Sequence, residues 1–127
     1  MTCKFEAEEG LIVGPTRLRG PAADTVARLA LDTGATRSLV ASAILVAIGY
    51  DPAAEPQRVR VTTGSGVEFV ASLLVETVEA LGIIHSEFPV LGHTLPPTAG
   101  VDGLLGLDFL RGRRLAIDFR TGSLTLE

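Results

Sequence analysis

One aspartate in this chain of 127 residues stands where a carboxylate is able to do acid–base chemistry. Asp32 follows the short apolar run of residues 29–31 and is followed directly by Thr33 and Gly34. The run predicts a buried strand, and the glycine allows a tight turn at its end. An ionised carboxylate is costly to desolvate unless donors hold it. Asp32 is therefore expected either to be capped by neighbouring donors or to be kept for chemistry.

A glycine-bearing segment lies between two further strand patterns. Residues 58–62 alternate with period 2, residues 67–78 are apolar and β-branched, and between them stand Thr63, Gly64, Ser65 and Gly66. This pattern predicts a long β-hairpin whose tip the glycines allow to bend. Alone, it describes an ordinary hairpin.

A third motif stands near the C-terminus, where Leu104 and Leu105 precede Gly106 and Asp108. The apolar pair predicts a short strand, and Gly106 is expected to let the chain turn at its end. Asp108 is then expected to cap the start of a short helix with its side-chain oxygen. Taken alone, this segment is an ordinary strand-to-helix turn.

The elements that must position these residues are mainly strands. Residues 3–19 predict a strand, a turn and a second strand, and residues 81–91 predict a pair of strand segments. A helix is expected over residues 43–48, with Ser42 as its N-cap and Gly49 as its end. The remaining predicted elements are strands at 25–31 and 38–40 and a C-terminal hairpin over 115–126.

Composition limits the class of protein. The length suits a single domain over residues 1–127, and a net charge of -4 argues against a nucleic-acid partner. Cys3 is the only cysteine, so an internal disulfide is impossible. No apolar run reaches membrane-spanning length, and the charged N-terminus lacks the apolar core of a signal peptide. We expect a cytoplasmic protein with no membrane partner.

Other chemistries find little support in the sequence. His85 and His93 are eight residues apart with no cysteine nearby, so no metal site is expected. Phosphoaspartate enzymes need a lysine downstream of the aspartate, and the only lysine here is Lys4. The chain has no phosphate-binding loop and no Gly-X-Ser-X-Gly turn.

In this order, the Asp-Thr-Gly-Ala loop at 32–35, the glycine-tipped hairpin and the apolar-apolar-Gly-X-Asp turn resemble the retropepsin-like aspartic proteases. These are the single-domain enzymes of retroviruses and some bacteria. The resemblance spans roughly residues 25–120, whereas residues 1–24 match no part of the family pattern. It implies a mainly β fold, a small closed β-barrel-like acid-protease unit with one or two short helices.

The resemblance also implies an activity, that of an aspartic endopeptidase without a cofactor. In the family, two carboxylates share one proton, one activating a water and the other protonating the scissile carbonyl oxygen. Asp32 would be catalytic, Thr33 would brace the loop against the partner's loop, and Gly34 would offer its N–H to the carboxylate. The remaining implied roles are loop support for Ala35, a substrate-covering flap for Thr63, Gly64, Ser65 and Gly66, and a structural turn beside the active site for Gly106 and Asp108.

The chain holds one Asp-Thr-Gly loop, so the resemblance implies a homodimer in which Asp32 faces its copy across a two-fold axis. Asp102 lacks a following threonine, and Asp108 is expected to open a helix. The C-terminal hairpin is expected to help form the interface, and a peptide or protein is the implied substrate. The alternative is a non-catalytic dimerisation or peptide-binding module with a protease-like fold.

Ala35 stands where stomach-type aspartic proteases carry serine, so one hydroxyl donor to the catalytic carboxylate is missing. A donor to the charged form favours that form, so its absence favours cleavage at pH values nearer neutral. Ala35→Ser should therefore move the acid limb of the pH–rate profile to lower pH. An acid limb that stays in place or moves upward would contradict this reasoning.

Overall fold

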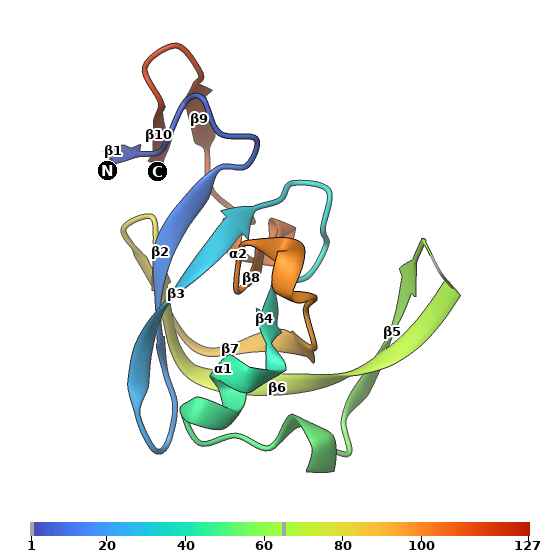
Figure 1. Ribbon diagram of the computed structural model, residues 1–127. Coiled ribbons are helices and arrows are strands. Elements are labelled where there is room, and N and C mark those ends of the chain that lie inside the picture. The colour runs from blue at the N-terminus through green and yellow to red at the C-terminus, as the bar shows by residue number, and fades with distance from the viewer. Residues whose placement is uncertain (1, 65) are drawn as a thin grey trace.

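The computed structural model describes residues 2–64 and 66–127, which form mainly β-strands and two short α-helices (Figure 1). None of the helices described is long and apolar enough to cross a bilayer. In chain order the elements are β1 (Thr2–Lys4), β2 (Val13–Arg19), β3 (Asp24–Leu31), β4 (Leu39–Ala41), α1 (Ser42–Ala47), the 3₁₀ turn η1 (Pro52–Ala54), β5 (Arg58–Thr63), β6 (Gly66–Ala80), β7 (Ile83–His93), the 3₁₀ turn η2 (Pro97–Ala99), β8 (Gly103–Leu105), α2 (Leu107–Leu110), β9 (Leu115–Asp118) and β10 (Ser123–Leu126).

Six strands close into a barrel in the order β2-β3-β8-β4-β7-β6. The ring closes because β6 also pairs with β2, where Leu18 lies opposite Val78. Strand β5 pairs with β6 outside the ring. The predicted fold class, a mainly β closed barrel with two short helices, is confirmed.

The barrel encloses a core of aliphatic side chains that the two helices help to seal. Helix α1 contributes Leu45 and Ile48 follows it, both fully buried, whereas α2 contributes Phe109. The Phe109 ring packs edge-to-face against Phe88 at a centroid distance of 5.7 Å and against His85 at 4.8 Å. Aromatic pairs in this geometry add stability beyond the area they bury, so α2 is firmly attached to β7.

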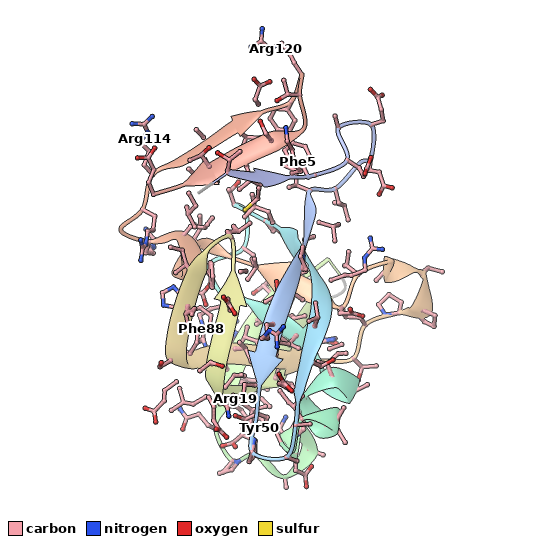
Figure 2. The ribbon with its side chains drawn as sticks, turned by 90° about the vertical axis from the view of Figure 1, so that its left-hand side faces the viewer. Phe5, Arg19, Tyr50, Phe88, Arg114 and Arg120 are labelled. Carbon is pink, nitrogen blue, oxygen red and sulfur yellow. The ribbon has the colours of Figure 1, made fainter. Side chains whose placement is uncertain are left out.

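The two chain ends form a separate three-stranded sheet beside the barrel, in the order β1-β10-β9 (Figures 1 and 2). Leu124 and Leu126 of the central strand are buried, and the rings of Phe5 and Phe119 meet edge-to-face at 6.0 Å. The C-terminal hairpin predicted over residues 115–126 is thus present, and its strand β10 has a partner on each side.

Two local predictions were wrong. Helix α1 begins at Ser42 itself, with Ala41 as its N-cap and no side-chain capping bond, although Gly49 follows its end as expected with φ +108°. Residues 83–93 form one continuous strand, β7, instead of a pair of segments. The neighbouring β6 explains this, because it pairs with β7 in one register from Ala80 to Ala71.

Phe109→Ala should lower the free energy of unfolding by about 3–5 kcal/mol, because it leaves a cavity beneath α2. Phe69→Ala is the matched control, since Phe69 is 67% exposed on β6 and its loss should change stability by less than about 0.5 kcal/mol. Chemical denaturation of both variants measures the difference. Equal losses would show that α2 does not depend on this aromatic contact.

Candidate active site

The loop that carries Asp32 bridges two strands that are not neighbours in the barrel. It leaves β3 after Leu31 and enters β4 at Leu39, and β8 lies between these strands, parallel to β3 and antiparallel to β4. The loop must therefore pass over the end of β8. Its first residue is fixed there, because the N–H of Asp32 donates to the carbonyl oxygen of Leu105 at 2.9 Å.

The Asp32 carboxylate is half-buried and is held by the backbone of its own loop. The N–H of Gly34 donates to Oδ1 at 2.8 Å, and the N–H of Ala35 donates to the Asp32 carbonyl oxygen at 3.2 Å. A side chain at Gly34 would place its Cβ 3.1 Å from the same Oδ1. Within the described part of the chain, Oδ2 of Asp32 has no hydrogen-bond donor, so it is available to another group.

The other loop residues have different surroundings. Thr33 is exposed, and its hydroxyl makes no hydrogen bond to any of residues 2–64 or 66–127. Ala35 is half-buried, and its carbonyl oxygen accepts a hydrogen bond from the N–H of Leu107 at 2.8 Å. The loop is thus tied at Ala35 to the start of α2, while Thr33 faces outward.

The far end of the loop is held by Ser38, a residue to which sequence reasoning gave no role. Ser38 is only 1% exposed. Its N–H donates to both carboxylate oxygens of Asp108 at 2.9 and 3.0 Å, and its hydroxyl donates to Oδ1 at 2.7 Å. The same hydroxyl oxygen accepts from the N–H of Gly106 at 3.0 Å. The available signal was a serine at the first position of a buried strand, where a hydroxyl needs a partner.

Arg37, the residue before Ser38, joins the same group of contacts. Its Nε lies 3.9 Å from Oδ2 of Asp108, and its Nη2 donates to the hydroxyl of Ser72 at 3.0 Å. The cation therefore connects the loop and the start of α2 to strand β6.

The structure changes two predicted roles at this turn. Asp108 is not the N-cap residue, because α2 begins at Leu107 with Gly106 as its N-cap, although Oδ1 of Asp108 accepts the N–H of Phe109 at 2.9 Å in the first turn. The same carboxylate also reaches back to Ser38. Gly106 is not needed for a turn either, since its φ of -97° suits any residue. It is needed for space, because a Cβ there would lie 2.8 Å from the carbonyl oxygen of Ala35.

The glycine-bearing hairpin lies apart from this cluster. Thr63 ends β5, Gly64 lies in the turn and Gly66 begins β6 with φ +132°, whereas Ser65 lies outside the described residues. Strand β6 pairs with β7 only as far as Ala71, so its outer part pairs with β5 alone and projects from the barrel (Figure 1). The residues that the structure does bring together are Asp32, Gly34, Ala35, Gly106 and Asp108.

Two further aspartates, Asp102 and Asp108, flank strand β8, and both accept hydrogen bonds. Oδ2 of Asp102 accepts the N–H of Arg28 at 2.8 Å, and Asp108 is bound to Ser38. Among residues 2–64 and 66–127, no three potential metal ligands gather into a group. Asp108 is thus engaged through both oxygens, whereas Asp32 and Asp102 each accept one backbone N–H through a single oxygen; only Asp32 lies in the loop beside the end of β8, because Asp102 precedes its start.

Comparison with known proteins agrees with this fold. A family model described as "gag-polyprotein putative aspartyl protease" matches residues 22–112. No match was found among curated protein sequences. A retropepsin-like aspartic protease from Rickettsia conorii superposes with a TM-score of 0.75 at 16% identity, over 99% of this chain and 88% of that one.

Two further solved structures share the fold. The EIAV protease, complexed with the inhibitor HBY-793, gives a TM-score of 0.63 at 22% identity over 82% of this chain and 88% of its own. The retroviral protease-like domain of Ddi1 from Leishmania major gives 0.59 at 18% identity, with coverages of 94% and 90%. The resemblance drawn from the sequence motifs is therefore confirmed. This chain belongs to the gag-polyprotein aspartyl protease family and has the retropepsin-like fold.

Proposed function

We propose that this protein is an aspartic endopeptidase that works as a homodimer, with Asp32 from each of two chains forming the catalytic pair. The observation that carries the proposal is where the neighbouring carboxylates lie and what they bind. Asp108 is bound to Ser38 through both of its oxygens, and Asp102 lies at the start of β8, at the opposite end of that strand from Asp32, so neither serves as the second acid beside Asp32. An isologous contact across a two-fold axis supplies that second acid without any further residue.

The proposed chemistry follows from two carboxylates in contact. Like charges at short distance do not both ionise, so the pair holds one proton. The ionised Asp32 takes a proton from water as the water oxygen attacks the scissile carbonyl carbon, and the protonated Asp32 gives its proton to the carbonyl oxygen. On collapse of the tetrahedral intermediate the C–N bond breaks. The leaving nitrogen takes the proton that the first Asp32 accepted from water, and a hydroxyl of the intermediate returns its proton to the other Asp32, which restores the singly protonated pair. No cofactor is required.

The loop geometry supports this assignment. The N–H of Gly34 points at Oδ1 of Asp32, where it stabilises the charged form of the pair. Thr33 is exposed, so its hydroxyl is free to brace the loop of a second chain. Ala35 and Ser38 fix both halves of the loop to the β8–α2 junction, which keeps the carboxylate in place.

The β5–β6 hairpin is the proposed flap over a peptide substrate. It projects from the barrel (Figure 1), and the side chains of Val67 and Phe69 on its outer part are exposed apolar groups. Exposed apolar residues on a projecting arm are suited to contact the side chains of an extended peptide. Peptide or protein substrates are therefore the proposed partners.

The terminal sheet is the proposed dimer contact, but for a different reason from the one that the sequence suggested. Sequence reasoning expected the apolar residues of the C-terminal hairpin to need cover from a partner, but Leu124 and Leu126 are already buried within the chain. The central strand β10 has both edges paired, so the outer edges of β1 and β9 are the ones open to a second copy.

Asp32→Asn should abolish peptide cleavage and should also poison the wild-type protein. If subunits exchange freely, activity should fall as the square of the wild-type fraction, to about a quarter in an equal mixture, because a mixed dimer has one carboxylate. Cleavage of a diverse peptide library, with and without an aspartic-protease inhibitor, supplies the assay. The matched control is Asp24→Asn, the same change at an exposed carboxylate at the other end of β3.

Each outcome of this mixing experiment discriminates. A linear fall after verified exchange means that each chain works alone, and the shared pair is then wrong. Peptide binding without cleavage at any protein concentration supports the non-catalytic binding module instead. Activity in the purified Asn variant above a mock preparation removes Asp32 from the chemistry.

A further inference from the structure

The β5–β6 hairpin leaves the barrel at one defined point. Pairing of β6 with β7 ends at Ala71 opposite Gly92, and the next residue of β7 is His93, the last of the strand. The His93 ring reaches across this root, because its Nε2 lies 2.6 Å from Oε2 of Glu68, three residues farther out along β6. This contact joins the barrel to the part of β6 that otherwise pairs with β5 alone.

Both nitrogens of the His93 ring face oxygen atoms that have no hydrogen to give. Nε2 meets the Glu68 carboxylate, and Nδ1 lies 2.7 Å from the carbonyl oxygen of Thr94. A neutral imidazole carries one N–H, so it would turn a lone pair toward one of these oxygens. The observed geometry satisfies both contacts only when His93 carries two N–H groups and a positive charge.

Among the charged groups around His93, Glu68 is the one that is hydrogen-bonded to its ring. A shallow hollow of about 600 Å³ beside the root is also bordered by Asp51 and Arg58. The Arg58 guanidinium donates to two carbonyl oxygens of η1 at 3.0 and 3.1 Å. Strand β4 places Ala41 opposite His93, and α1 adds only uncharged side chains to the hollow.

We propose that His93 is a positioning residue that, in its charged form, tethers the root of the β5–β6 hairpin through Glu68. This inference rests on the proposed function, because it gives the proposed flap a pH-dependent anchor. The tether acts on the hairpin and leaves Asp32 untouched. Charge-assisted hydrogen bonds of this kind are stronger than neutral ones, so losing the charge weakens the link.

The direction of the pH dependence follows from the causes of the His93 shift. The hydrogen bond to Glu68, and then that to the Thr94 carbonyl, raises the pKa of His93 above its ordinary value of 6.5. A raised pKa means that the contact is fully present below pH 6.5 and is lost as the pH rises through the raised value. The hairpin root is therefore tethered below pH 6.5 and released as the pH rises through the raised pKa of His93.

Hydrogen exchange of the hairpin amides in the free protein tests this without any substrate. After correction for intrinsic exchange, the amides of residues 58–70 should exchange several-fold more slowly at about pH 5.5 than at about pH 8.5. Glu68→Gln keeps the side-chain shape and removes the charge, so it should abolish that ratio. The matched control, Glu79→Gln, changes an exposed carboxylate on the same strand and should keep the wild-type ratio.

An NMR titration of His93 supplies the second readout. Glu68→Gln should lower the pKa of His93 toward 6.5, whereas Glu79→Gln should leave the pKa of His93 unchanged. Equal exchange at both pH values in the wild type, or a retained ratio in Glu68→Gln, overturns the tether. If the protein shows the pH-dependent exchange ratio but cleaves no peptide, the tether is supported and the proposed function is wrong. The two failures are therefore distinguishable.

Discussion

The fold around Asp32 depends on the buried contact between Ser38 and Asp108. A carboxylate that is largely shielded from water must be matched by donors, and Asp108 receives three, from the N–H and hydroxyl of Ser38 and from the N–H of Phe109. Because Ser38 lies at the end of the loop and Asp108 in the first turn of α2, this contact joins two segments that are distant in the sequence. The aromatic packing of Phe109 against β7 then holds the clamp to the rest of the barrel.

The order of strands creates the need for this clamp. Since β8 lies between β3 and β4, the Asp32 loop has to pass over the β8–α2 junction. The crossing is close enough that only a residue without a side chain fits at Gly106, under the carbonyl of Ala35. Backbone bonds from Asp32 to Leu105 and from Leu107 to Ala35 complete the crossing. The carboxylate therefore stands on a loop whose two ends and middle are all fixed, as precise chemistry requires.

The β5–β6 hairpin is held in a different way. The outer part of β6 has one neighbouring strand, so few backbone hydrogen bonds hold it. The side-chain ion pair at the hairpin root therefore contributes a larger share of its attachment. One molecule thus combines a rigid loop, built from buried hydrogen bonds, with an arm whose root depends on an exposed pair. Buried contacts of the first kind respond little to solvent conditions, whereas His93 and Glu68 respond to pH.

Local patterns in the sequence determined most strands, both hairpins, the end of α1 at Gly49 and the family, because period-2 alternation and glycine punctuation are properties of neighbouring residues. They also singled out Asp32, because the Asp-Thr-Gly-Ala motif occupies four consecutive residues. Tertiary structure alone decided that Asp108 binds Ser38, that Gly106 provides space instead of a turn, and that His93 meets Glu68. Ser38 and Asp108 are 70 positions apart in the chain, and they meet only because β8 inserts between β3 and β4. A contact that depends on strand order has no signature in the residues on either side of it.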